Sequence, residues 1–294
     1  MNDNKKPLVS VLMTAYNRER YIGEAIQCVI NQSYDNWELI ITDDQSKDLT
    51  LKIANEYAQQ DMRIKVFRNE ENLGDYPNRN MAASYAQGKY LKYLDSDDLM
   101  YPWALEIMVN LMEQNPQAQW GLCSMPQNPF KLYPYVLHPT EIYKANYFDK
   151  IPIFSRAPLS AIITKKAFNE VGGFSGKQHL GDFEMWHILG RYYPLLLMPQ
   201  GMVWYREHED QQMNDNRIDL FVPFKYLINA KENISHIDCP LSNNDKEKIL
   251  KDINYRICTT IVRTLCKRKF SKVNQMLQAS GVSLFTAFVH VLKK

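Results

Sequence analysis

Two short acidic clusters in the first hundred residues carry side chains that could hold a metal ion. They are Asp43-Asp44 and Asp95-Ser96-Asp97-Asp98, and each follows an apolar segment typical of a β-strand. Carboxylates close together offer hard oxygen ligands to Mg²⁺ or Mn²⁺, which complete their coordination with phosphate oxygens and water. Aspartate is also frequent in turns and at helix starts. One cluster alone is therefore a weak signal, and two at strand ends are a stronger one.

The segments around these clusters alternate between the two periodicities of secondary structure. We predict strands over residues 8–14, 37–42, 64–67, 90–94 and 119–124, and helices over residues 21–30, 49–60, 77–87 and 102–114. This alternation predicts βαβ units and a largely parallel sheet with helices on both faces. Ligands bind such sheets beyond the carboxyl ends of the strands, so both acidic clusters are expected to face one crevice.

The rest of the chain has less regular patterns. Residues 125–147 combine prolines and aromatic residues without a clear period and are predicted to be irregular. After them we predict a strand over 159–164, a helix over 165–171 that stops at Gly172-Gly173, a helix over 182–192, and helices over 221–232, 244–266 and 282–292. We therefore expect an α/β domain over residues 1–220 and a helical extension over residues 221–294.

Charge is unevenly distributed along the chain. Residues 221–294 hold 13 Lys/Arg against 5 Asp/Glu, a net charge of +8, whereas the whole chain has a formal net charge of +2. An acidic body with a basic tail indicates that the two parts meet different partners.

Neither the cysteines nor the apolar runs indicate export or membrane insertion. The five cysteines include no C-x-x-C pair, which argues against a disulfide framework or a cysteine-ligated zinc site and favours a reducing cytosol. We find no signal-peptide core and no apolar run near the roughly 20 residues that span a bilayer. A cytoplasmic protein is expected.

Four segments together resemble the family 2 glycosyltransferases, which have the GT-A fold. They are residues 9–17 (VSVLMTAYN), 38–48 (ELIITDDQSKD), 72–74 (NLG) with Arg79-Asn80, and 88–98 (GKYLKYLDSDD). Their order and spacing also match, and the similarity covers about residues 7–210. The resemblance implies a GT-A α/β domain, with a nucleotide-sugar half at about residues 1–125 and an acceptor half at about 126–220.

The resemblance implies a donor site for a nucleotide diphosphate sugar. Thr14 and Tyr16 would line the nucleotide pocket, and Asp44, supported by Asp43, would accept a hydrogen bond from the base edge, expected to be uracil. The implied contacts to the donor are Thr14, Tyr16, Asp43, Asp44, Arg79, Asp95, Ser96 and Arg206, with Arg79 at the nucleotide or its diphosphate and Asp95 at the ribose or sugar. Gln45 stands where the family usually has glycine, which weakens the choice of uracil.

The resemblance also implies the metal site. Asp97 would ligate Mn²⁺ or Mg²⁺, and His208, in the R-x-H element Arg206-Glu-His208, would approach the metal or the diphosphate. The leaving group is a nucleoside diphosphate, whose negative charge grows as the anomeric bond breaks. A divalent cation and an arginine, here Arg206, would stabilise that charge.

Asp182 is the residue that the resemblance implies as catalytic base. It lies in Gly181-Asp-Phe-Glu-Met-Trp186, although the family's aspartate typically follows a glutamate rather than a glycine. A carboxylate at a helix start could take the proton of an acceptor hydroxyl, and Glu184 is the second candidate. The alternative is that Asp182 is an ordinary helix N-cap. In-line attack opposite the leaving group would invert the configuration at the anomeric centre, and the family 2 glycosyltransferases are inverting enzymes.

The basic tail suggests contact with a membrane surface. Arg and Lys side chains at 256, 263, 267–269 and 272 interleave with apolar residues, a pattern that resembles a helix lying on anionic lipid. The alternative is that the apolar faces pack on the catalytic domain. The resemblance implies a saccharide or a lipid-linked saccharide as the acceptor. We expect peripheral attachment at the inner face of the cell membrane, because relatives often use lipid-linked acceptors.

Several competing functions are weaker. The chain lacks the Q-x-x-R-W motif and transmembrane helices of processive relatives, so we expect transfer of one sugar, in bacterial surface polysaccharide or glycan assembly. A nucleotidyltransferase should have a glycine-rich phosphate loop after the first strand, and none occurs. A catalytically inactive nucleotide-sugar binding protein would not need Asp97 and Asp182. We find no nucleic-acid-binding motif and no G-x-G-x-x-G element.

Overall fold

The structure, a computed structural model, describes residues 6–208 and 221–292 of the 294-residue chain. The chain forms two compact units, Met1–Arg206 and Glu207–Lys294. Residues 209–220 lie outside the described part, so the predicted domain boundary at residue 220 stays a prediction.

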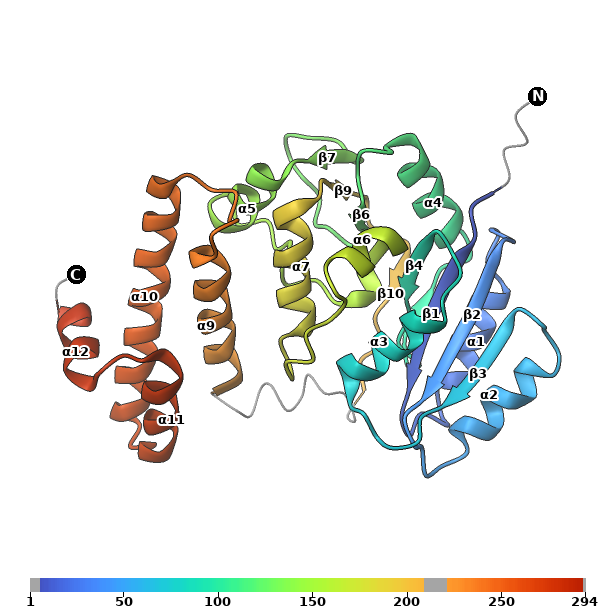
Figure 1. Ribbon diagram of the computed structural model, residues 1–294, viewed down its shortest axis with the longest axis horizontal. Coiled ribbons are helices and arrows are strands. Elements are labelled where there is room, and N and C mark those ends of the chain that lie inside the picture. The colour runs from blue at the N-terminus through green and yellow to red at the C-terminus, as the bar shows by residue number, and fades with distance from the viewer. Residues whose placement is uncertain (1–5, 209–220, 293–294) are drawn as a thin grey trace. The chain divides into compact units, whose positions relative to one another are not determined.

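The first unit is built on a sheet whose strand order is β3-β2-β1-β4-β8-β6-β9-β7 (Figure 1). Its strands are β1 (Val9–Ala15), β2 (Trp37–Asp43), β3 (Ile64–Arg68), β4 (Tyr90–Tyr93), β6 (Trp120–Leu122), β7 (Tyr135–Leu137), β8 (Ala161–Thr164) and β9 (Leu195–Leu197). The first four are parallel, and β8 runs antiparallel between β4 and β6. A separate antiparallel pair joins β5 (Leu99–Met100) to β10 (Val203–Trp204). The predicted α/β architecture is confirmed.

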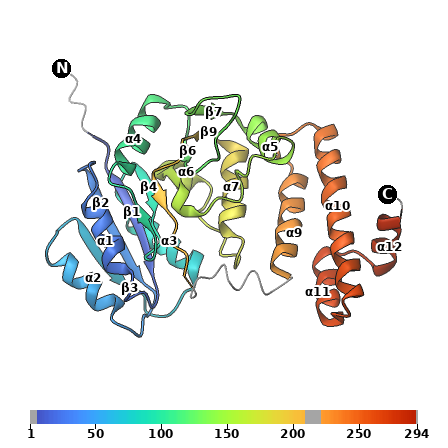
Figure 2. The ribbon, with the colours of Figure 1, turned by 180° about the vertical axis from the view of Figure 1, so that it is seen from behind.

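Helices cover both faces of this sheet (Figure 1 and, from behind, Figure 2). They are α1 (Ile22–Ile30), α2 (Thr50–Ala58), α3 (Asp75–Tyr85), α4 (Ala104–Gln114), α5 (Pro139–Tyr147), the 3-10 turn η1 (Pro158–Ser160), α6 (Lys165–Glu170) and α7 (Gly181–Tyr192). The apolar sides of α1 and α4 bury Ile26 and Met108 against Val11 and Met13 of β1. Because side chains alternate along a strand, Ser10 faces the other side.

Close backbone approach at Gly88 fixes the start of β4 beside β1. A Cβ at Gly88 would lie 2.6 Å from the Ser10 nitrogen and 2.7 Å from the Leu8 oxygen. The Gly88 amide donates to Ser10 Oγ (2.8 Å), which in turn donates to Glu38 Oε1 (2.7 Å). Only glycine fits this contact between neighbouring backbones.

We expect Gly88→Ala to lower the free energy of unfolding by about 1–3 kcal/mol, because the rigid neighbouring backbone must shift to admit a methyl group. Gly23→Ala in α1 is the matched control: its new methyl group would meet no atom closer than 3.8 Å, and alanine favours a helix. Urea unfolding of both variants measures the difference. Equal midpoints for the two would contradict the steric account.

The prediction that residues 125–147 are irregular is wrong for their second half, which forms β7 and α5. Pro139 stands at the first position of α5, where its missing N–H costs nothing. The His138 amide donates to Glu141 Oε2 (2.8 Å), half of a capping box. β7 forms only because it pairs with β9, a partner distant in sequence.

The second unit is helical, as predicted. It contains α9 (Phe221–Ser235), α10 (Asn243–Cys266), α11 (Phe270–Ser280) and α12 (Leu284–Leu292), of which α11 was not predicted. Gly281, in a left-handed conformation (φ 65°), ends α11. In the described residues no single helix has the length and apolar composition of a membrane span. Helices α11 and α12 meet that test only as a pair, and they are bent by 88°.

Candidate active site

The strand order brings the two acidic clusters to one edge of the sheet. β2 lies on one side of β1 and β4 on the other, so the topology reverses at β1, where open α/β sheets bind ligands. At the carboxyl end of β1, Thr14 is partly buried and Tyr16 is 45% exposed. Asp44 follows β2, and Asp95 lies just beyond β4. Both clusters therefore lie at the carboxyl edge of the sheet, and the single crevice that they were expected to face stays a prediction.

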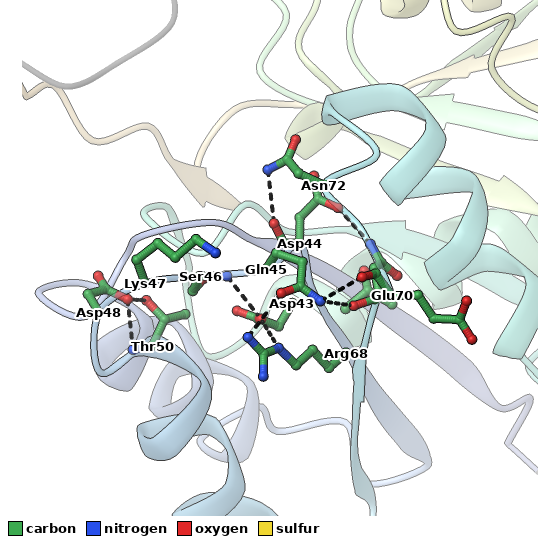
Figure 3. Close-up of polar contacts among 12 residues, drawn as sticks. Asp43, Asp44, Gln45, Ser46, Lys47, Asp48, Thr50, Arg68, Glu70 and Asn72 are labelled. Carbon is green, nitrogen blue, oxygen red and sulfur yellow. Dashed lines mark hydrogen bonds and ion pairs between the residues drawn. The ribbon is translucent and has the colours of Figure 1, made fainter.

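Asp44 is buried, and three donors from one loop hold its carboxylate. Figure 3 shows Asp44 next to Asp43 and Gln45, with the Asn72 side chain close to it. Asp44 Oδ1 accepts from Asn69 Nδ2 (2.7 Å) and the Leu73 amide (2.8 Å), and its Oδ2 accepts from the Gly74 amide (2.9 Å). An ionised carboxylate has about four acceptor positions. Within the described residues Oδ2 therefore keeps one position for a further N–H, as the role of base acceptor requires.

Asp43 and Gln45 shape the turn that carries Asp44. Asp43 Oδ2 accepts from the Ser46 amide (3.1 Å) and lies 3.8 Å from Arg68 Nε, while its buried Oδ1 has no hydrogen-bond partner in the described part of the chain. Gln45 has φ 66°, in the region that favours glycine. Its side-chain amide donates to the backbone oxygens of Asn69 and Glu70, which offsets the conformational cost.

Arg79 lies beneath the second acidic cluster. Its Nε is 2.7 Å from Asp75 Oδ1 and its Nη2 is 2.7 Å from Asp95 Oδ1, with only 8% of its side chain exposed. Burial alone would lower the pKa of Arg79, but the Asp75 and Asp95 carboxylates outweigh it and hold that pKa above its ordinary value. Arg79 therefore stays charged and orients Asp95.

Two further arginines hold the rest of the cluster. Arg18 Nε is 2.9 Å from Asp97 Oδ2. The Arg206 amide donates to Asp98 Oδ1 (2.9 Å), and Arg206 Nε donates to the Asp97 backbone oxygen (2.7 Å). Arg206 Nη2 also pairs with Glu24 Oε2 at 2.6 Å. Ser96, between these carboxylates, is buried.

Burial and neighbouring negative charge raise the pKa values of two carboxyls in this cluster. Burial, and then the neighbouring Asp95 charge, raise the pKa of Asp98 to about 8. The pKa of Asp95 is also raised, chiefly by burial, although Arg79 opposes the shift. No group of three or more His, Cys, Asp or Glu in the described residues surrounds a single point. Asp97 with phosphate oxygens and water still fits the coordination that Mg²⁺ and Mn²⁺ prefer.

Asp182 lies in the first turn of α7, where Oδ1 accepts from the Tyr76 hydroxyl (3.2 Å) and the Phe183 amide (2.7 Å). Burial raises its pKa to about 6. Nothing in the described chain donates to Oδ2, so that oxygen can accept a further hydrogen bond. Glu184 instead binds Lys177 Nζ (2.7 Å) and the Ser175 hydroxyl. Asp182 is the better placed of the two candidate bases.

His208 belongs to the second compact unit, which begins at Glu207. Its predicted approach to the metal or diphosphate therefore stays a prediction.

Residues of helix α3 contact both the donor-side aspartates and Asp182, which the sequence analysis did not predict. The amide of Gly74, directly before this helix, donates to Asp44. Within the helix, the Tyr76 hydroxyl donates to Asp182. Arg79 forms an ion pair with Asp95. Asn78 joins the network by accepting from Asn69 Nδ2 at 2.9 Å. The missed residues are Arg18, Asn69, Tyr76 and Asn78, and their roles depend on partners far away in the chain.

The sequence is similar to those of known glycosyltransferases. A family model described as Glycosyl transferase family 2 matches residues 10–172. The chain is 30% identical over 220 residues to an uncharacterized glycosyltransferase of Haemophilus influenzae, covering 70% of this chain and 67% of that protein. It is 41% identical over 108 residues to the Escherichia coli UDP-Glc:alpha-D-GlcNAc-diphosphoundecaprenol beta-1,3-glucosyltransferase WfgD, covering 37% of this chain and 42% of WfgD. That match spans less than half of WfgD.

The crystal structure of S. aureus TarS 1-349 in complex with UDP-GlcNAc has the same fold. The TM-score is 0.72 at 18% identity, and the alignment covers 92% of this chain and 81% of the TarS chain. This likeness shows the GT-A fold that the sequence predicted.

Proposed function

The chain belongs to glycosyl transferase family 2, and we propose that it transfers a single sugar from a UDP-sugar to an acceptor hydroxyl with inversion of the anomeric centre. The observation that carries this proposal is the position of Asp182. Its carboxylate has one open oxygen, a pKa raised to about 6, and a connection through α3 to the carboxylates of the donor side. A base with a pKa just below neutral suits proton removal at physiological pH.

The donor side supports a nucleotide diphosphate. The open position on Asp44 Oδ2 suits the imide N–H of uracil, and Tyr16, exposed beside it at the end of β1, offers a ring for the base. WfgD acts on UDP-Glc and TarS binds UDP-GlcNAc, which favours a uridine donor for this chain as well.

A divalent cation, Mn²⁺ or Mg²⁺, would be held by Asp97 and would stabilise the negative charge of the departing diphosphate. Asp95, oriented by Arg79, would hydrogen-bond the ribose or sugar hydroxyls. Arg18 and Arg206 lie against Asp97 and place positive charge beside the same phosphates. Asp182 Oδ2 would accept the proton of the attacking hydroxyl.

The acceptor is proposed to be a lipid-linked saccharide, in the assembly of a surface polysaccharide. WfgD acts on a GlcNAc-diphosphoundecaprenol acceptor, which supports this class. The basic second unit also exposes Phe270, Phe285 and Leu292, so peripheral contact with an anionic membrane is part of the proposal.

Release of nucleoside diphosphate from a panel of UDP-, GDP- and dTDP-sugars, with Mn²⁺ and a diphosphoundecaprenol saccharide, tests the proposal. We expect release only with a UDP-sugar, because Asp44 would bind uracil, and only with a divalent cation, because Asp97 would bind the metal. Release should also require the acceptor. NMR of the product should show the opposite anomeric configuration to the donor. Binding of UDP-sugars without any transfer would favour an inactive binding protein, and retention of configuration would overturn the mechanism.

A further inference from the structure

The Tyr76 side chain, from helix α3, contacts the Asp182 carboxylate on helix α7. Only 7% of Tyr76 is exposed, and its ring packs on Phe174 with the centroids 5.3 Å apart. The hydroxyl donates to Asp182 Oδ1 across 3.2 Å, from a helix that otherwise serves the donor side. Burial raises the pKa of Tyr76, so this hydroxyl stays protonated and remains a donor.

Gly181 provides the space for that ring. A Cβ at Gly181 would lie 2.5 Å from Tyr76 Cδ1 and 2.6 Å from Cε1, a contact that no real side chain makes. The first residue of α7 therefore has no side chain where the Tyr76 ring lies. Tyr76 and Gly181 form a matched pair, because any larger residue at 181 displaces the tyrosine from Asp182.

We propose that Tyr76 is a positioning residue for the base: its hydroxyl holds Asp182 Oδ1, so that Oδ2 is directed at the acceptor hydroxyl. The proposal rests on the proposed function, and it adds that α3 links donor recognition to the base. Of the other charged groups near Asp182, Arg79 and Asp75 come from α3 and pair with each other. Glu184, on α7 itself, is paired with Lys177.

A hydrogen bond to the ionised carboxylate stabilises it, so removing the Tyr76 hydroxyl raises the pKa of Asp182 above its value of about 6. A hydrogen bond to a charged group corresponds to a shift of about one unit. With that shift, the loss of kcat/KM in Tyr76→Phe is about fivefold greater at pH 6 than at pH 8. A purely structural role would lower the rate equally at both values.

The experiment combines a kinetic pH profile with a ¹³C NMR titration of the aspartate carboxyls, in which Asp182→Asn assigns the Asp182 signal. Tyr76→Phe is expected to move both the acid limb and the Asp182 midpoint upward by about one unit. Tyr85→Phe, at the other end of α3 and stacked on Phe67, is the matched control and should move neither.

Gly181→Ala provides a second variant. It should also raise the Asp182 midpoint, and this effect should vanish in the Tyr76→Phe background, where there is no hydroxyl left to displace. An unchanged midpoint in Tyr76→Phe, or a rate loss that is equal at pH 6 and pH 8, overturns the proposal. If the wild-type protein transferred no sugar, the proposed function would fail, while the titration would still decide whether Tyr76 controls Asp182.

Discussion

Asp182→Asn is expected to lower kcat by about 10²–10⁴-fold and to raise the stability of the protein at pH 7.5. The activity falls because asparagine cannot take a proton from the acceptor hydroxyl. Its side chain has nearly the same shape and can still accept from the Tyr76 hydroxyl and the Phe183 amide, so substrate binding should change little. Steady-state kinetics with donor and acceptor varied separately measure this: kcat should fall while the KM values stay within about threefold.

The stability gain follows from the direction of the pKa shift. Burial raises the pKa of Asp182 to about 6 from 3.8, so the folded chain binds this proton more tightly than the unfolded chain. The stability that the group contributes therefore falls as pH rises from about 4 to above 6. Asparagine avoids this loss, and we expect a gain of about 1–2 kcal/mol at pH 7.5 that shrinks at pH 5.

Urea unfolding of the wild type and of Asp182→Asn at pH 5 and pH 7.5 tests whether the stability gain depends on pH. A gain that is equal at pH 5 and pH 7.5 would contradict the raised pKa. Glu184→Gln tests the rival assignment: if that substitution abolished transfer while Asp182→Asn did not, Glu184 would be the base.

Asp97→Asn is expected to lower kcat/KM by about 10²–10³-fold and to weaken Mn²⁺ binding in the presence of UDP. An amide oxygen is a weaker ligand for a hard cation than a carboxylate. The variant also loses its ion pair with Arg18, which is 24% exposed, so the effect on stability should be only about 1 kcal/mol. Calorimetric titration of Mn²⁺ into the UDP complex reports metal binding independently of turnover.

Asp61→Asn is the matched control for this variant. Asp61 also pairs with an arginine, with Arg63 Nη2 at 2.6 Å from its Oδ2, but it precedes β3 at the amino edge of the sheet, away from the site. It should leave both Mn²⁺ binding and transfer unchanged. Unaltered Mn²⁺ affinity in Asp97→Asn would show that Asp97 is not a ligand.

The sequence predicted the elements whose pattern is local and periodic. β1 and β2 are short apolar runs that end in polar residues, and α1 places Ile22, Ile26 and Val29 on one side, so each was predicted to within two residues at either end. β7 could not be found in this way, because its three residues become a strand only by pairing with β9. The start of α11 lies close behind the end of α10, and no glycine or proline between them marks the break.

The site could be predicted as far as the family resemblance reached. It implied Asp44, Asp97 and Asp182, whose roles stay predictions, and the structure brings the first two to one edge of the sheet. The partners of these residues were missed for a physical reason. Asn69 and Tyr76 are buried polar side chains that face other polar groups, and no hydrophobic period marks such positions.

The stretch from Leu73 to Arg79 has a consequence for protein engineering. Its backbone amides hold Asp44, and its side chains then hold Asp182 and Asp95 within two turns of helix. Surface loops usually tolerate a change in length, but one inserted residue here would rotate Tyr76 and Arg79 away from their partners. A design that changes the donor specificity of this chain must therefore replace residues 73–79 together, along with Gly181, which packs against Tyr76.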